Sequence, residues 1–228
     1  MTSDRSSVAA RDNILARIRA RQGKPATPVV SERDAVAAHI KAHPRNARPE
    51  LAWDPVVRFR EQALRLASTI EDVTSLDGVP AATARYLRQH GLSLTAVCWP
   101  QFADLPWQGA GMDVETRTAR DTDLVGVTGV FCAIAETGTL MTVSGPRTPA
   151  TASLLPETHI AIVPASRIVR GMEEAWQLVR AELGQPPRAV SFISGPSRTA
   201  DIEQTVTLGA HGPYRVHIIV IEASVTDV

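Results

Sequence analysis

The sequence has 228 residues, of which 44% are hydrophobic and 21% charged, a composition close to that of ordinary globular proteins. At about 150 residues per domain, this length fits one α/β domain with an extension. The 24 Lys and Arg residues balance the 24 Asp and Glu residues, so the whole chain has no net charge to attract nucleic acid or an anionic membrane. The composition therefore excludes disordered, collagen-like and coiled-coil proteins and argues against a nucleic-acid-binding function.

The cysteines and the apolar runs restrict the cofactors and the compartment. Cys98 and Cys132 are too few and too far apart for a disulfide framework, a zinc site or an iron–sulfur cluster. The histidines and carboxylates also lack the spacing of a metal site, so we expect no metal bound by this chain. No run approaches 18 apolar residues and residues 1–7 are polar, which predicts a cytoplasmic protein without a membrane span.

The N-terminal segment differs in charge from the rest of the chain. Residues 1–48 contain ten Lys and Arg against four Asp and Glu, a net charge of +6, and the remainder carries −6. Apolar residues at helical spacing predict one amphipathic helix that ends near Gly23. This helix either packs on its own domain or a neighbouring subunit, or it docks on a partner or a membrane surface. The following residues, to position 50, are rich in proline and predict a linker with one short helix near residues 34–43.

The remaining residues, 51–228, alternate helical and strand patterns, which is typical of an α/β domain. Asp54 and Pro55 form an N-cap and a first helical position, and the apolar spacing predicts a helix that continues to about Glu71. Trp176 falls on the apolar face of a later helix and is expected to be part of the core. We predict further helices over residues 80–90 and 171–183, and strands over residues 92–98, 160–163, 189–193, 205–208 and 216–221, the last two as neighbours around a turn.

Residues 124–143 are apolar segments interrupted by glycine, and Glu136 is the one acid among them. Glu136 precedes the turn Thr137-Gly138-Thr139, where hydrophobic periodicity gives no reason for a carboxylate. It is therefore either a surface turn residue or a functional group, because site residues of α/β folds commonly follow strands.

A loop of small residues follows the predicted strand at 189–193, and we expect it to bind an anion. Its hydroxyls, backbone N–H groups and single guanidinium suit a phosphate or a carboxylate, although it matches no known phosphate-loop pattern. A similar Ser-Gly-Pro-Arg sequence that contains Arg147 either lines the same ligand-binding crevice as this loop, or has these residues only because they favour turns. The expected ligand-binding residues of the main loop are Ser194, Gly195, Ser197, Arg198 and Thr199.

Two histidines near the end of the chain receive different interpretations. His211, in the tripeptide His-Gly-Pro, has the chemistry of a general acid/base or a ligand at neutral pH. His217 lies inside an apolar strand and is expected to be structural. Asp201 and Glu203 would repel a bound anion, so we assign them to helix capping or to exposed faces.

Several ordered motifs together resemble the LUD domain of the lactate utilization protein C (LutC) family. The resemblance covers about residues 54–222 and is densest from residue 124 onward. The motifs are Gly126-Val127-Thr128-Gly129, Ala135-Glu136-Thr137-Gly138-Thr139, Ser153-Leu154-Leu155-Pro156, Val163-Pro164-Ala165-Ser166, Phe192-Ile193-Ser194-Gly195-Pro196-Ser197 and His211-Gly212-Pro213.

This resemblance implies a fold similar to the NagB/RpiA/CoA-transferase group, an open, mainly parallel sheet flanked by helices, here with an N-terminal helical extension. It also implies a role in the oxidation of L-lactate to pyruvate, as the subunit without iron–sulfur clusters that acts with iron–sulfur partner proteins. The candidate catalytic residues are Glu136 and His211. On this interpretation the turn at Glu136, with Thr137 and Gly138, and the small-residue loop bind a small carboxylate or phosphorylated ligand or contact the partner.

Two alternatives remain open from the sequence. A free-standing enzyme could use acyl/CoA-transfer or isomerase chemistry, because Glu136-Thr137-Gly138 is similar to the Glu-x-Gly of CoA transferases, in which the glutamate is the nucleophile. The chain has no glycine-rich CoA-binding loop, so this alternative rests on the fold alone. A regulatory module would instead bind a metabolite in the same crevice without turning it over.

Overall fold

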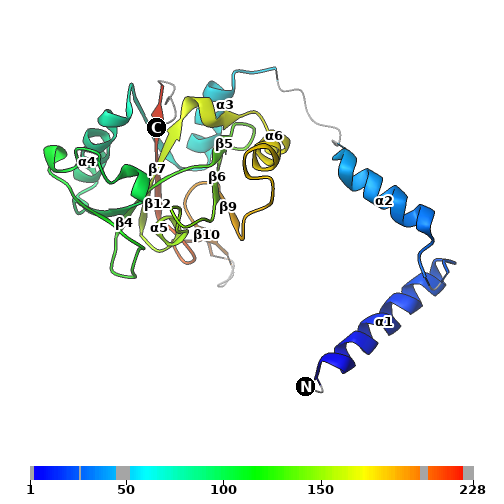
Figure 1. The fold of residues 1–228 in the computed structure, drawn as a ribbon. Helices are drawn as coiled ribbons and strands as arrows, with labels where there is room; N and C mark the ends of the chain where they lie inside the picture. Colours follow the sequence, from blue (N-terminus) through cyan, green and yellow to red (C-terminus); the bar gives the residue numbers. More distant parts are fainter. Residues whose placement is uncertain (1–2, 26, 45–51, 201–204, 223–228) are drawn as a thin grey trace. The chain divides into compact units, whose positions relative to one another are not determined.

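The structure is a computed structural model that describes residues 3–25, 27–44, 52–200 and 205–222 (Figure 1). The chain divides into two compact units, Met1–Pro49 and Glu50–Val228. The first unit contains helices α1 (Ser3–Arg21) and α2 (Val30–Ala42). The first helix ends just before Gly23, as predicted, and the second begins four residues earlier than expected.

The second unit is built on a six-stranded sheet in which all neighbouring strands are parallel. The three central strands are buried almost throughout, as expected for a parallel sheet covered on both faces. The predicted open, mainly parallel sheet flanked by helices is therefore confirmed. In spatial order the strands are β1 (Thr69–Val73), β12 (Arg215–Ile221), β7 (Thr158–Pro164), β4 (Val125–Gly129), β2 (Thr95–Cys98) and β3 (Asp113–Thr116).

Helices α4 (Val79–Gln89) and α3 (Pro55–Arg65) pack on opposite faces of this sheet. Leu87 of α4 shares a core with Ile160 and Ile219, whereas Phe59 of α3 shares a second core with the adjacent strand residues, including Ile218. Because successive side chains of a strand point to opposite faces, the two cores lie on either side of the sheet.

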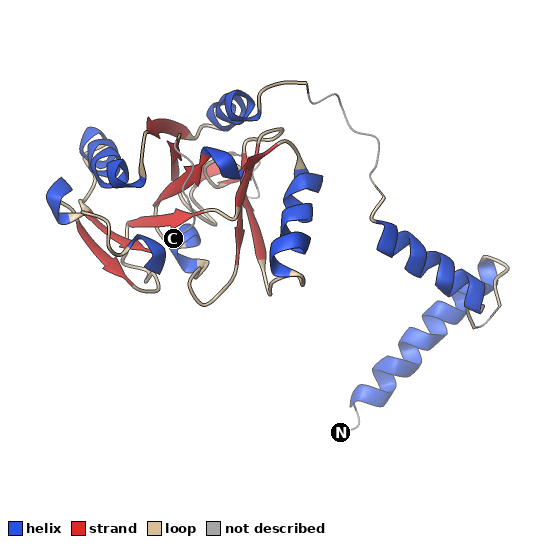
Figure 2. Ribbon diagram, turned by 45° about the horizontal axis from the view of Figure 1, so that its top comes forward, coloured by secondary structure: helices blue, strands red, loops and turns tan. Residues whose placement is uncertain are grey.

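A second sheet of four strands extends from the first (Figure 2). Its order is β8 (Ile168–Val169), β5 (Cys132–Ile134), β6 (Thr139–Val143) and β9 (Val190–Ile193). Helix α6 (Met172–Leu178), which continues as one wider π-helical turn over Val179–Leu183, packs on it. Trp176 is half-buried at this contact, with its ring edge-to-face to Phe192 at 6.0 Å.

Short elements complete the second unit. Helix α5 (Thr151–Leu154) lies next to β4 and β7. Single 3-10 turns occur at Leu76–Gly78, Pro100–Phe102, Gln108–Ala110 and Ala165–Arg167. Among the described residues, no helix is both long enough and apolar enough to cross a membrane.

The prediction that the helix beginning at Pro55 continues to Glu71 is wrong. Helix α3 stops at Arg65, and Ala67 has a φ of 66°, in the left-handed region. The N–H of Ser68 donates to the carbonyl of Ala63 at 3.0 Å, which closes the helix as a Schellman motif does. Ile70 and Glu71 therefore belong to strand β1, which the sequence analysis missed.

The predicted pairing of the two C-terminal strands is also wrong. Strand β12 lies between β1 and β7, whereas β11 (Thr207–Leu208) pairs antiparallel with β10 (Arg198–Thr199). The small-residue loop continues at Arg198 and Thr199 into this short strand. Asp201 and Glu203 lie outside the described residues.

Candidate functional site

Helix α3 positions the candidate site. The Asp54 side chain accepts a hydrogen bond from the N–H of Val57 at 2.9 Å, and Pro55 occupies the first turn, so the helix begins where the sequence predicts. Arg170, just after β8, donates to the carbonyl of Trp53 at 2.6 Å, which ties the second sheet to the segment that precedes the helix.

Two glycine turns pack directly against the C-terminal half of α3. A Cβ atom at Gly138 would lie 2.5 Å from the nitrogen of Ala63, and one at Gly195 would lie 2.2 Å from the carbonyl oxygen of Leu66. Both glycines also have positive φ, 66° and 79°. Ala63 and Leu66 are three residues apart, about one helical turn, so the turns that follow β5 and β9 lie close together along the helix.

A chain of hydroxyl groups connects these two turns. The Oγ1 of Thr139 lies 2.8 Å from the Oγ1 of Thr137 and 2.7 Å from the Oγ of Ser194. Thr139 is buried, whereas Thr137 and Ser194 are exposed. The buried hydroxyl therefore fixes two exposed hydroxyls relative to each other.

The remainder of the small-residue loop is held between α3 and the loop that precedes β12. Arg198 Nη2 donates to the carbonyl of Leu66 at 3.1 Å, and the Arg198 side chain is otherwise exposed. The N–H of Ser197 donates to the carbonyl of Pro213 at 2.9 Å, and the Ser197 hydroxyl accepts from the N–H of His211 at 3.3 Å. His211 is thus joined to the site through its backbone, and its side chain is exposed.

Glu136 lies beside the start of α6. Its N–H donates to the carbonyl of Arg170 at 2.9 Å, and its carboxylate lies 3.3 Å from the position that a Cβ of Gly171 would occupy. Carboxylate oxygens of Glu173 and Glu174 lie within 3.5 Å of the same position. Glu136, Glu173 and Glu174 therefore form an acidic group at the start of α6. Glu136 directly precedes Thr137 of the cluster formed by the hydroxyls of Thr137, Thr139 and Ser194 and the Arg198 guanidinium.

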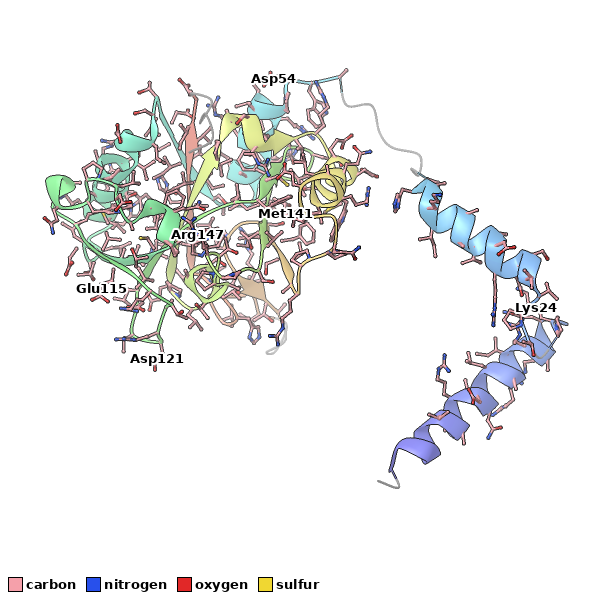
Figure 3. The ribbon with its side chains drawn as sticks, viewed as in Figure 1. Lys24, Asp54, Glu115, Asp121, Met141 and Arg147 are labelled. Carbon is pink, nitrogen blue, oxygen red and sulfur yellow. The ribbon has the colours of Figure 1, made fainter. Side chains whose placement is uncertain are left out.

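Arg147 is placed apart from that cluster, whereas Thr199 directly follows Arg198 in the chain. Arg147 follows the far end of β6, and the turn that contains it is closed by a hydrogen bond from Thr148 to the Val143 carbonyl at 2.7 Å (Figure 3). The length of β6, about 13 Å at 3.3 Å per residue, separates this turn from Thr139, which favours ordinary turn chemistry over a shared crevice for Arg147. Thr199 is half-buried in strand β10.

The cluster does not lie where sites of α/β folds usually gather. Leu66 precedes β1 and Pro213 precedes β12, so the loop over residues 194–199 lies at the amino edge of the main sheet. The loop therefore lies at the edge opposite the carboxyl ends of the parallel strands, where ligand sites of open α/β sheets usually form.

Several titratable groups outside the cluster are buried in the part of the chain that the structure describes, among them two histidines and both cysteines. Burial lowers the pKa of His159 to about 4 and raises the pKa of the Cys132 thiol to about 12. Burial also raises the pKa of Cys98. The pKa of His217 is lowered to about 4, mainly by burial and further by nearby positive groups.

His217 has the structural role expected from the sequence. Its Nδ1 lies 2.8 Å from the Thr69 hydroxyl, and its ring stacks on Tyr86 at 4.0 Å. Both cysteines are buried and reduced. Within the described residues, no group of three or more His, Cys, Asp or Glu side chains is arranged to hold a metal ion.

The arrangement suits the binding of a small anion. The exposed Arg198 guanidinium and the exposed hydroxyls of Thr137 and Ser194 lie within about one turn of α3, and such donors match a carboxylate. Glu136 precedes Thr137 in the chain, and His211 contacts Ser197 through its backbone N–H. Thr139, which lies in the Thr-Gly-Thr turn, and Leu66 were not among the residues that the sequence pointed to, although the position of Thr139 in that turn was a signal.

Comparison with known proteins identifies the family. Residues 106–221, about half of the chain, match the model of the LUD domain. The chain therefore belongs to the LUD domain family, as the sequence motifs predicted.

Within that family, the chain is similar to proteins named lactate utilization protein C. The protein from Bacillus licheniformis is 29% identical over 197 residues, which cover 83% of this chain and 79% of the relative. The one from Bacillus subtilis is 33% identical over 158 residues, 66% of each chain. The crystal structure of a DUF162 family protein from Deinococcus radiodurans, 25% identical, superposes with a TM-score of 0.55 over 77% of this chain and all of that chain.

Proposed function

We propose that this protein takes part in lactate utilization, as the subunit that holds no iron–sulfur cluster and works with iron–sulfur partner proteins in the oxidation of L-lactate to pyruvate. The observation that supports this role is the similarity, over most of the chain, to proteins named lactate utilization protein C. Oxidation of lactate to pyruvate releases two electrons and two protons, and in this proposal the iron–sulfur partners accept the electrons.

The cluster on α3 gives the chain a specific task within that role. Lactate and pyruvate are small carboxylates, and the Arg198 guanidinium with the hydroxyls of Thr137 and Ser194 offers the donors that a carboxylate accepts. We assign this cluster to carboxylate binding. Glu136 and His211 stand as the proton-transferring groups beside it.

Growth tests the role directly. A strain that lacks this protein should fail to grow on L-lactate but grow normally on pyruvate, because only the oxidation step is lost. Restoring the wild-type chain should restore growth on lactate. Unimpaired growth of the deletion strain on lactate would overturn the proposal.

Binding tests the site. Calorimetric titration of the purified chain with L-lactate and with pyruvate should show that Arg198→Gln weakens binding by about tenfold, the effect of losing one charge-assisted contact of about 1.4 kcal/mol. Arg147→Gln is the matched control, because Arg147 lies beyond the other end of β6. Equal effects of the two substitutions would reject the α3 cluster as the site.

Catalytic turnover by the isolated chain would favour the alternative of a free-standing enzyme. Glu136→Gln is the relevant variant, because a nucleophilic carboxylate cannot be replaced by an amide. Ligand binding without turnover, and without any effect of the gene on growth with lactate, would instead favour a regulatory module.

A further inference from the structure

A cavity of about 770 Å³ lies on the exposed face of α4, between this helix and the loop over residues 108–111. Sites for small molecules typically have volumes of roughly 300–1,000 Å³. Helix α3, on which the cluster with Arg198 lies, packs on the opposite face of the main sheet. The cavity is therefore separate from the candidate site described above.

The lining of the cavity has the composition of an anion site. Two guanidinium groups and two amides line it, and none of the described residues that line it is acidic. All the other lining residues are alanine or glycine, whose small size leaves the backbone accessible. Guanidinium and amide N–H groups donate hydrogen bonds, so the cavity suits a negatively charged group with several acceptor oxygens. The four polar lining residues are Arg85, Arg88, Gln89 and Gln108.

Helical spacing brings three of these side chains together. Arg85, Arg88 and Gln89 lie at i, i+3 and i+4 in α4, and all three are exposed. Ala81, one turn earlier on the same face, adds only a methyl group and leaves room in the cavity. Leu87 on the other side of the helix is fully buried in the core, so the helix holds the polar face in a fixed position.

Arg88 is the charged group that the cavity has available. Its Nη2 donates to the carbonyl of Ala110 at 2.7 Å, and a Cβ at Gly111 would lie only 3.0 Å from this nitrogen. Among the described residues, Arg88 forms no ion pair, whereas Arg85 pairs with Glu71. The positive charge of Arg88 is therefore held in place by a neutral carbonyl and has no carboxylate to compensate it.

The loop that forms the other wall is fixed by buried side chains. Trp107 and Met112, which flank it, are both buried, and the Nε1 of Trp107 donates to the carbonyl of Phe102 at 2.8 Å. The N–H of Met112 donates to the carbonyl of Trp107 at 3.0 Å, which closes the loop. A wall that is already in place lowers the entropy cost of binding a ligand.

We propose that this cavity binds a phosphate group, with Arg88 as its charged anchor and Arg85, Gln89 and Gln108 as further donors. A phosphate monoester carries about two negative charges and three terminal acceptor oxygens at neutral pH, so it uses more of these donors than a carboxylate does. The volume of the cavity leaves room for the organic part of a small phosphorylated molecule. This site is independent of the proposed role in lactate utilization.

Calorimetric titration of the full-length chain at constant ionic strength tests the proposal, with inorganic phosphate and glycerol 3-phosphate as probes. Arg88→Gln should weaken the binding of phosphate by at least about tenfold, because it removes the charged anchor. Gln108→Glu should do the same by placing a negative charge in the cavity, and it leaves the bond between Arg88 and Ala110 untouched. Tighter binding of glycerol 3-phosphate would identify a phosphorylated metabolite as the ligand, and binding of inorganic phosphate that is at least as tight would identify free phosphate.

Two matched controls carry the same changes of charge elsewhere. Arg198→Gln removes the guanidinium of the α3 cluster, and Gln177→Glu adds a carboxylate on the exposed side of α6. Both should bind the probes like the wild type, and circular dichroism should show equal helix content in all variants. Failure of the wild-type chain to bind either probe, unchanged binding in either cavity variant, or loss of binding in Arg198→Gln would overturn the proposal.

Discussion

Gly195 lies directly against the carbonyl oxygen of Leu66, and a Cβ atom at that position would come within 2.2 Å of the oxygen. The contact brings the loop over residues 194–199 onto the end of helix α3, where Arg198 donates to the same carbonyl. The backbone at Gly195 has a φ of 79°, so both the space and the conformation require glycine.

We predict that Gly195→Ala destabilises the protein by clearly more than about 1 kcal/mol, because it adds a clash with backbone to the strain of positive φ. The matched control is Gly91→Ala, which has a similar φ of 63° but no atom within 4 Å of the new methyl group. The difference between the two variants in urea unfolding isolates the contact with Leu66. Equal losses of stability would show that the loop does not lie against α3.

Ala67→Gly should stabilise the protein. Ala67 has a φ of 66° at the end of α3, and an alanine in this conformation costs about 1 kcal/mol relative to glycine. Thermal and urea unfolding should therefore show a gain of about 0.5–1 kcal/mol. Ala82→Gly, in the interior of α4, should do the opposite, and a loss of stability for Ala67→Gly would mean that α3 does not end in this motif.

Thr139→Val should loosen the connection between the two turns. The substitution keeps the shape of the side chain but removes the hydroxyl that lies between Thr137 and Ser194, at a cost of about 1 kcal/mol. Hydrogen exchange of residues 194–199 should become faster. Thr83→Val, which removes a buried hydroxyl bonded to the Val79 carbonyl in α4, should lower stability to a similar extent without changing exchange in that loop.

Stability should fall as the pH is lowered from about 6.5 to about 4. The pKa values of His159 and His217 are about 4 in the folded protein against an ordinary value near 6.5, so within this range the unfolded chain binds more protons than the folded chain. Across this pH range the lowered pKa of each histidine reduces the free energy of unfolding by up to about 3 kcal/mol, at about 1.36 kcal/mol per pKa unit.

Urea unfolding at a series of pH values measures this effect. His217→Gln should flatten the part of the pH dependence that His217 contributes, relative to the wild type. His39→Gln, on an exposed face of α2, should leave the curve unchanged. Constant stability between pH 6.5 and 4 would contradict the burial of both histidines in their neutral form.

The sequence predicts the sheet class and most of the helices because their signals are local. The apolar runs of β7 and β12 and the caps of α3 and α4 are visible without any tertiary information. The end of α3 is not, because Ile70 continues the helical spacing and the residue that ends the helix in the left-handed conformation is Ala67 rather than glycine. Strand β1 was therefore merged into the predicted helix.

In the candidate site, too, local sequence signals reveal the separate parts but not how they come together. Glu136 and the loop over residues 194–199 were found from their composition, because small residues and isolated charges stand out among apolar segments. The packing of the Gly138 turn and of this loop side by side on α3 depends on how the second sheet packs, which no local pattern encodes. The similar sequence around Arg147 was misleading for the same reason, since strand direction places it at the far end of β6.

Affinity purification from cells grown on lactate tests the central claim most directly. The tagged full-length protein would be isolated after anaerobic lysis, which preserves iron–sulfur clusters, and the iron in the eluate would be measured together with its protein composition. Our account predicts iron and iron–sulfur partner proteins in the eluate. Recovery of this protein alone, free of iron, would contradict it.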